Sequence, residues 1–155
     1  MPQQYFNASF RNLAYRLRKF KDIIKEELQQ IVLNHEHEIL CMIAEDQMYN
    51  RGVTGKNTEI IPGYKISTIR RKKKKGQITD YVTLKDTGLF YNKMHVEYDE
   101  NGFFITSDTQ YTQSLIEKYG SAIFRLTNEN LSILIREYIR PELQQKLTNL
   151  LSSND

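Results

Sequence analysis

A run of six consecutive cations is the part of this sequence whose residue types could most directly bind a partner: Arg70, Arg71, Lys72, Lys73, Lys74 and Lys75. Lys and Arg side chains hold phosphates with an affinity that depends on salt and not on base sequence. The run contains no aromatic residue that could stack on single-stranded bases, and the nearest are Tyr64 and Tyr81. Three interpretations stay open: a phosphate contact, docking onto an acidic surface of a neighbouring subunit, and a solvated loop kept soluble by its charge.

Two other segments resemble ligand sites but lack the required spacing. Residues 51–58 contain two glycines and then Lys56, whereas a phosphate-binding loop has four residues between its glycines and Ser or Thr directly after the lysine. His35 and His37 lie about 200° apart around a helix, so that only His37 and Cys41 share a face. Two ligands do not complete a tetrahedral metal site. We expect a turn, a buried histidine and a packed thiol, with neither a metal nor a cofactor.

No catalytic set emerges from the remaining polar residues. Cys41 lies inside a helical pattern, whereas a nucleophilic thiol needs an exposed helix start or a histidine held beside it. Asp80, Asp86, Asp99 and Glu117 lie in or near the predicted sheet, and no pair among them stands out. The residue pattern therefore gives an enzyme interpretation little support. A small enzyme with an unrecognised site among these carboxylates stays a rival interpretation.

The elements that position these residues begin with a long helix. Apolar residues recur at steps of three or four from Leu13 to Met42, and no Gly or Pro interrupts residues 9–49. A helix of that length extends about 60 Å, which is longer than a compact chain of this size is wide. We therefore expect it either to break near Lys21 and Asp22 or to project as an arm that packs against another chain.

A β meander is predicted over residues 64–106. Residues 64–69 and 78–84 are rich in β-branched and aromatic residues and flank the basic run, which is expected to form a loop over residues 70–77. Asn101-Gly102 is a strong hairpin signal, because both residues tolerate positive φ. These signals predict a small antiparallel sheet with hairpins.

Helical patterns return over residues 112–151. Residues 112–119 form one candidate helix, and Thr127 or Asn128 caps the next. Pro141 forces a kink or a new start within this second helical stretch. The order of a long N-terminal helix, a meander and C-terminal helices predicts an α+β fold.

Composition narrows the class of protein. The chain suits a single domain, residues 1–155, and its 39% of hydrophobic residues is adequate for a core. The longest apolar stretches are a few residues, whereas a membrane span needs about 20, so we expect no membrane partner. The start lacks the apolar run of a signal peptide, and the one cysteine fits a reducing compartment. We expect synthesis in a cytoplasm.

The net charge of +3 conceals an asymmetry between the two halves of the chain. Residues 1–75 carry 15 Lys or Arg and 8 Asp or Glu, a net +7, whereas residues 76–155 carry 7 and 11, a net −4. One interpretation is an acidic or nucleic-acid partner for the basic half. The other is head-to-tail self-association, in which the acidic face of one copy meets the basic face of the next.

Several short motifs follow one another in a recognisable order from Leu84 onward. They are Leu84-Lys85-Asp86-Thr87-Gly88-Leu89-Phe90, a strand and hairpin over Val96 to Ser107, Tyr111, Ile116-Glu117-Lys118-Tyr119-Gly120, and Arg140-Pro141-Glu142-Leu143. In this order, and with its long N-terminal helix, the chain resembles the head–tail connector or tail-completion proteins of tailed bacteriophages, also called minor capsid or virion-morphogenesis proteins. It departs from them in two places: Glu142 stands where the family tends to have an aromatic residue, and residues 127–139 form an additional helix before the Arg-Pro step.

The resemblance implies that the protein is not an enzyme but a structural protein of the virion neck or tail, made in the cytoplasm of the bacterial host. Its partners would be copies of itself in a ring, the neighbouring portal, connector or tail proteins, and the DNA that passes through the lumen. A ring needs two different surface patches that fit each other. Candidates for the interface are Arg16, Arg18, Lys19, Lys25, Asp99, Glu100 and Glu117. The alternative function is a nucleic-acid-binding accessory protein that uses the basic run on phosphates.

Overall fold

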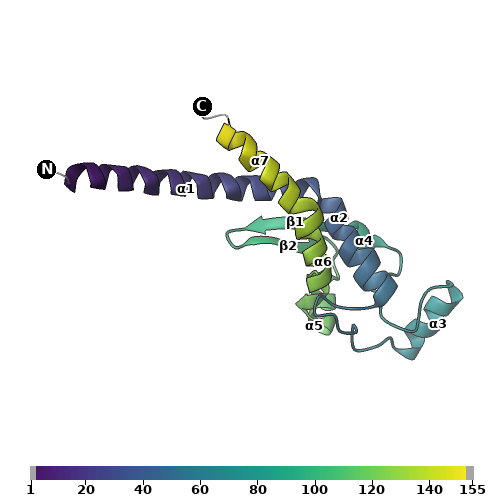
Figure 1. Cartoon of the computed structure of the whole chain (residues 1–155). Coiled ribbons are helices and arrows are strands. Elements are labelled where there is room, and N and C mark those ends of the chain that lie inside the picture. The colour runs from purple at the N-terminus through teal and green to yellow at the C-terminus, as the bar shows by residue number, and fades with distance from the viewer. Residues whose placement is uncertain (1–2, 153–155) are drawn as a thin grey trace.

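The computed structural model describes the backbone of residues 3–152 and the side chains of residues 11, 14, 15 and 18–149. It is an α+β fold in which a long N-terminal helix and a shorter C-terminal helix extend from a mixed body (Figure 1). In chain order the elements are α1 (Gln3–Asn34), α2 (Glu36–Cys41), η1 (Met42–Arg51), α3 (Ile66–Lys74), α4 (Leu89–Asn92), β1 (Met94–Asp99), β2 (Gly102–Ser107), α5 (Thr112–Tyr119), η2 (Ser121–Phe124), α6 (Asn128–Ile133), η3 (Leu134–Ile139) and α7 (Arg140–Ser152). Within the described residues, no helix is both long and apolar enough to cross a membrane.

The segment predicted as one long helix, residues 9–49, is helical but contains a break. His35 leaves the helical conformation between α1 and α2, with φ −108° and ψ 21°. The break therefore lies there and not near Lys21 and Asp22. α1 has 32 residues, about 48 Å, and projects from the body (Figure 1). The helical run ends at Arg51, where Gly52 adopts a left-handed φ of 62° that helix C-termini favour.

The two strands predicted for residues 64–69 and 78–84 are wrong. Most of the first segment and the basic run form helix α3, so the expected loop over residues 70–77 is largely helical. Five of the nine residues of α3 are Lys or Arg, which are good helix formers. Residues 78–84 pair with no strand in the described part of the chain, and the backbone N–H of Thr83 donates instead to Tyr64 Oη at 2.9 Å.

The hairpin is confirmed as a two-stranded antiparallel sheet. β1 and β2 pair in the register Asp99 with Gly102, which leaves a tight turn between them. Asp99 Oδ1 accepts hydrogen bonds from the N–H groups of Asn101 and Gly102, at 2.7 and 3.1 Å, and so closes the turn. One face of the hairpin, which carries Val96 and Ile105, is buried, and the opposite face is largely exposed.

The C-terminal helices follow their sequence signals. α5 spans residues 112–119 as predicted. Thr127 caps α6, since its side chain accepts a hydrogen bond from the N–H of Asn130 at 3.2 Å. The helix then continues through the wider π-helical turns of η3 into α7, where Pro141 is the second residue. A widened turn before Pro141 relieves the clash that its ring makes with the preceding turn.

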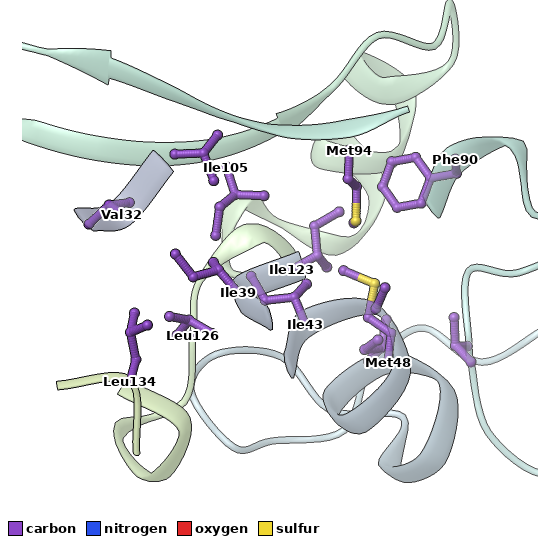
Figure 2. Packing of buried hydrophobic residues seen from close by; sticks show 14 residues of the cluster. Val32, Ile39, Ile43, Met48, Phe90, Met94, Ile105, Ile123, Leu126 and Leu134 are labelled. Atoms are coloured by element: carbon purple, nitrogen blue, oxygen red, sulfur yellow. The ribbon is translucent and has the colours of Figure 1, made fainter. Parts of the chain in front are cut away.

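The core joins the helical segment α2–η1 to the buried face of the hairpin and to the C-terminal helices (Figure 2). Ile39, Ile43 and Met48 come from the helical segment and are fully buried. They pack against residues of β1, β2, η2 and η3, among them Met94, Ile105, Ile123 and Leu134. Each such side chain contributes roughly 1.5–3 kcal/mol by its burial. This core fixes the hairpin against the first third of the chain.

Polar contacts hold the C-terminal part of α1 to the body. Tyr98 Oη donates to the carbonyl of Gln29 at 3.0 Å, which ties β1 to α1. Lys146 on α7 forms an ion pair with Glu27, which ties α7 to the same part of α1. All described side chains between residues 11 and 19 are exposed, Tyr15 to 67%. The N-terminal part of α1 thus projects beyond the contacts that hold the rest.

Candidate interaction surfaces

One residue of the basic run is an internal part of the fold. Lys72 is only 2% exposed. Its ammonium group donates to Gln77 Oε1 at 3.1 Å and to the carbonyl of Lys85 at 2.5 Å, and it lies 5.0 Å from the centre of the Tyr64 ring. Lys72 therefore fastens α3 to the segment that follows it. It is not available as a partner contact, which corrects its place among the candidates.

Two further cations of the run are committed to one carboxylate. Lys75 Nζ donates to Asp86 Oδ1 at 2.6 Å, and the Arg71 guanidinium lies 3.6 Å from Asp86 Oδ2. The hydrogen bond from Lys75 is the main cause that lowers the pKa of the Asp86 carboxyl, and the charges of Lys75, Arg71 and Lys72 add to it. Arg71 and Lys75 remain exposed, but their charge is partly neutralised inside the molecule.

The other three cations of the run form a free surface. Arg70, Lys73 and Lys74 are exposed, and in the described part of the chain none of them has an ion-pair partner. At 100° per residue these three lie on one side of α3 together with Ile66, which is 69% exposed. We call this surface, Ile66, Arg70, Lys73 and Lys74, the basic face of α3.

The exposed side of the hairpin carries the opposite charge. Glu97, Asp99 and Glu100 are exposed, and the strand register places Glu97 opposite Phe104, which is 42% exposed. The hairpin, residues 94–107, contains no Lys or Arg, and its one histidine, His95, lies with Nε2 2.9 Å from Glu97 Oε1. We call this surface, Glu97, Asp99, Glu100 and Phe104, the acidic hairpin face. It contains both acidic residues that were predicted at the hairpin as interface candidates.

The remaining interface candidates lie on two other helices. Arg18, Lys19 and Lys25 are exposed on α1. The side chain of Arg16, on the same helix, lies outside the described residues. Glu117 is exposed on α5, where it accepts a hydrogen bond from Gln113 at 3.1 Å. The candidates thus form no single patch.

The two histidines of the first third have different partners, and only His37 lies beside the cysteine, as the spacing indicates. His35 Nε2 lies 2.6 Å from Glu142 Oε1, and its ring packs on Tyr138. His37 Nε2 lies 3.6 Å from Cys41 Sγ. Burial raises the pKa of the Cys41 thiol, and nearby glutamates add to the shift. Among the described residues, no group of three or more His, Cys, Asp or Glu could hold a metal ion.

Residues 51–58 form a turn whose glycines serve close packing. A Cβ atom at Gly52 would lie 2.3 Å from Tyr81 Cδ2, and one at Gly55 would lie 2.3 Å from the carbonyl oxygen of Arg125. The N–H of Gly55 donates to the carbonyl of Ala122 at 2.8 Å, which docks the turn against η2. These N–H groups and glycines are engaged with protein atoms, which confirms the turn expected for this segment.

The carboxylates of the rival enzyme interpretation lie on four different segments. Asp80 precedes Tyr81 in an irregular stretch, Asp86 pairs with Lys75, Asp99 closes the hairpin turn and Glu117 lies on α5. Asp86 lines a groove of about 550 Å³ between α3, residues 84–90 and α5. Its carboxylate there is bound to a lysine.

Comparisons with known proteins do not indicate a function, so the geometry of these surfaces is the main evidence for one. No protein-family model, curated protein or solved structure matches the chain.

A buried polar network was not predicted from the sequence. In it, Gln47 Oε1 accepts hydrogen bonds from the N–H of Thr127 at 2.8 Å and from Asn130 Nδ2 at 3.1 Å. The only sequence signal for it is a glutamine on the apolar side of the first helical stretch, together with the Thr127 cap.

Proposed function

We propose that this protein is a structural component of a tailed-bacteriophage virion, which acts at the head–tail junction or completes the tail as a ring of identical copies. The observation that carries the proposal is α1. This helix of 32 residues projects from the body, and two of its described apolar side chains, Tyr15 and Leu33, are 67% and 46% exposed (Figure 1). A projecting helix of this kind is stabilised when it packs against another chain.

Two properties of the rest of the molecule support a ring. Surfaces of opposite charge lie on different elements, α3 and the hairpin, and a ring needs two unlike patches that fit each other. The motifs from Leu84 onward follow the order found in the connector family. In this proposal the protein acts in the virion neck or tail, beside portal, connector or tail proteins, and carries no catalytic site.

The test is the location of the protein in virions. Particles of the phage that encodes it are labelled with a gold-conjugated antibody against this chain and imaged in negative stain. We expect gold at the neck or the tail. Virions whose neck and tail stay unlabelled, while the antibody detects the denatured protein, contradict the proposal.

A nucleic-acid-binding accessory role is the second candidate, and the free cations of the basic face favour it. Three phosphate contacts by Arg70, Lys73 and Lys74 would give log K a slope of about −2.7 against log salt concentration. Replacing the three by Gln should abolish that slope, whereas K56Q/K93Q/K118Q removes three exposed cations from other elements and should not. DNA binding that survives the first triple substitution dismisses this role.

A further inference from the structure

We propose that the basic face of α3 in one copy docks onto the acidic hairpin face of the next copy, head to tail. This inference rests on the proposed ring-forming function and names the two surfaces that join its subunits. The occupant of each surface is a second copy of this chain, and the reasons are charge, size and placement.

The two surfaces match in composition. The basic face has three exposed cations, Arg70, Lys73 and Lys74. The acidic hairpin face has three exposed carboxylates, of which Glu97 also pairs with His95 and Asp99 also closes the turn. Each surface also has one large exposed apolar side chain, Ile66 at 69% and Phe104 at 42%. The cations of one copy attract the carboxylates of the next copy at long range and orient the two molecules, while Ile66 and Phe104 supply apolar contact area.

The two surfaces are also comparable in length. From Ile66 to Lys74 the helix rises about 12 Å, and from Glu97 to Asp99 the strand extends about 7 Å, with Glu100 next to it in the turn. Beside Phe104 runs a groove of about 750 Å³, which Phe124 and Leu131 also line. Leu131 is 38% exposed there. An isoleucine carried in by α3 of the next copy would find apolar walls in this groove.

The two faces lie too far apart to contact each other within one molecule, so each can bind the other only on another copy. Figure 1 shows α3 and the turn between β1 and β2 at opposite ends of the body. The two faces of one copy therefore cannot satisfy each other. Two unlike, complementary patches on one molecule generate a heterologous interface, which closes into a ring or continues as a filament.

The exposed Ile66 favours a protein partner over DNA for this face. A phosphate backbone offers no apolar pocket to Ile66, which lies one turn before the cations on the same side of α3. The complementary acidic face with its own apolar residue occurs on the same chain. DNA as the occupant is an outcome that the experiment below distinguishes.

The experiment reverses charges on full-length protein and follows self-association by analytical ultracentrifugation at low salt. K73E/K74E makes the α3 face acidic, and E97K/E100K makes the hairpin face basic. Each variant alone should self-associate at least tenfold more weakly than the wild type, because like charges then meet across the interface. An equimolar mixture of the two should recover association, and so should the quadruple variant. The exposed pair K56E/K93E is the matched control and should leave association unchanged.

The possible outcomes test the proposed interface and the proposed ring-forming function separately. Oligomers that form and ignore both reversals overturn this interface and leave the ring proposal standing. A wild type that stays monomeric at every concentration overturns the interface and ring formation together. Reversal on α3 that abolishes DNA binding while self-association is unchanged assigns this face to DNA. Far-UV circular dichroism checks that each variant is folded, and recovery in the mixture is a readout that a misfolded variant cannot give.

Discussion

The division of the basic run into one buried cation and five exposed ones can be tested by unfolding. In K72A the carbonyl of Lys85 and the amide oxygen of Gln77 lose their donor, and the ring of Tyr64 loses its cation. A hydrogen bond to a charged group contributes about 1.5–3 kcal/mol and a desolvated cation–π contact about 2 kcal/mol. The several kcal/mol that it costs to bury an ammonium group offset much of this. With the packing of the aliphatic stem also lost, we expect K72A to destabilise the fold by about 3 kcal/mol.

The assay is urea denaturation of the full-length protein at pH 7, followed by circular dichroism at 222 nm. K72M keeps most of the buried stem and should lie between K72A and the wild type. K73A is the matched control: the same residue type on the same helix, but exposed, so its midpoint should equal that of the wild type. The reasoning is refuted if K72A and K73A unfold at the same urea concentration.

Three further predictions concern single residues. G52A should destabilise the fold by more than about 1 kcal/mol in the same urea assay, because position 52 has φ +62° and no room for a Cβ atom. G63A is the control and should be nearly neutral, because a Cβ atom there meets no neighbour. Equal effects of the two substitutions would contradict the packing of this turn. The pKa of the Asp86 carboxyl is lowered in the folded state from its ordinary value of 3.8. The charged carboxylate therefore stabilises the fold at pH values above 3.8, and this stabilisation is lost as the pH falls through the lowered pKa. D86N should thus be less stable than the wild type at pH 7, and the difference should shrink in urea titrations at pH 3. Burial raises the pKa of Cys41, so iodoacetamide should modify it more slowly in the folded protein than in urea at the same pH, as mass spectrometry would show; equal rates would refute the burial.

The parts of the fold that the sequence predicted correctly depend on local signals. The Asp99–Gly102 turn, the helix over residues 112–119 and the Thr127 cap are each decided by a few neighbouring residues with strong conformational preferences. The long N-terminal helix could also be predicted from local signals, because its apolar residues recur at helical spacing and no Gly or Pro interrupts them.

The errors arose where distant contacts decide the structure. Residues 78–84 have strand-like composition, but they pair with no strand among the described residues, and the backbone of Thr83 bonds instead to the side chains of Tyr64 and Tyr91. The basic run reads as six equivalent cations, and only the packing of α3 on Tyr64 and residues 83–86 separates buried Lys72 from exposed Lys73. The spacing of Ile69 and Lys72, three residues apart on one helix side, was the one local signal for it.

The most direct test of the proposed function is a reconstruction of the neck of the virion by electron cryomicroscopy. We predict a ring of copies of this chain, with α1 packed against a neighbouring subunit and α3 of each copy against the hairpin of the next. A neck in which no density fits α1 and the α2–η1 core of this chain would contradict it.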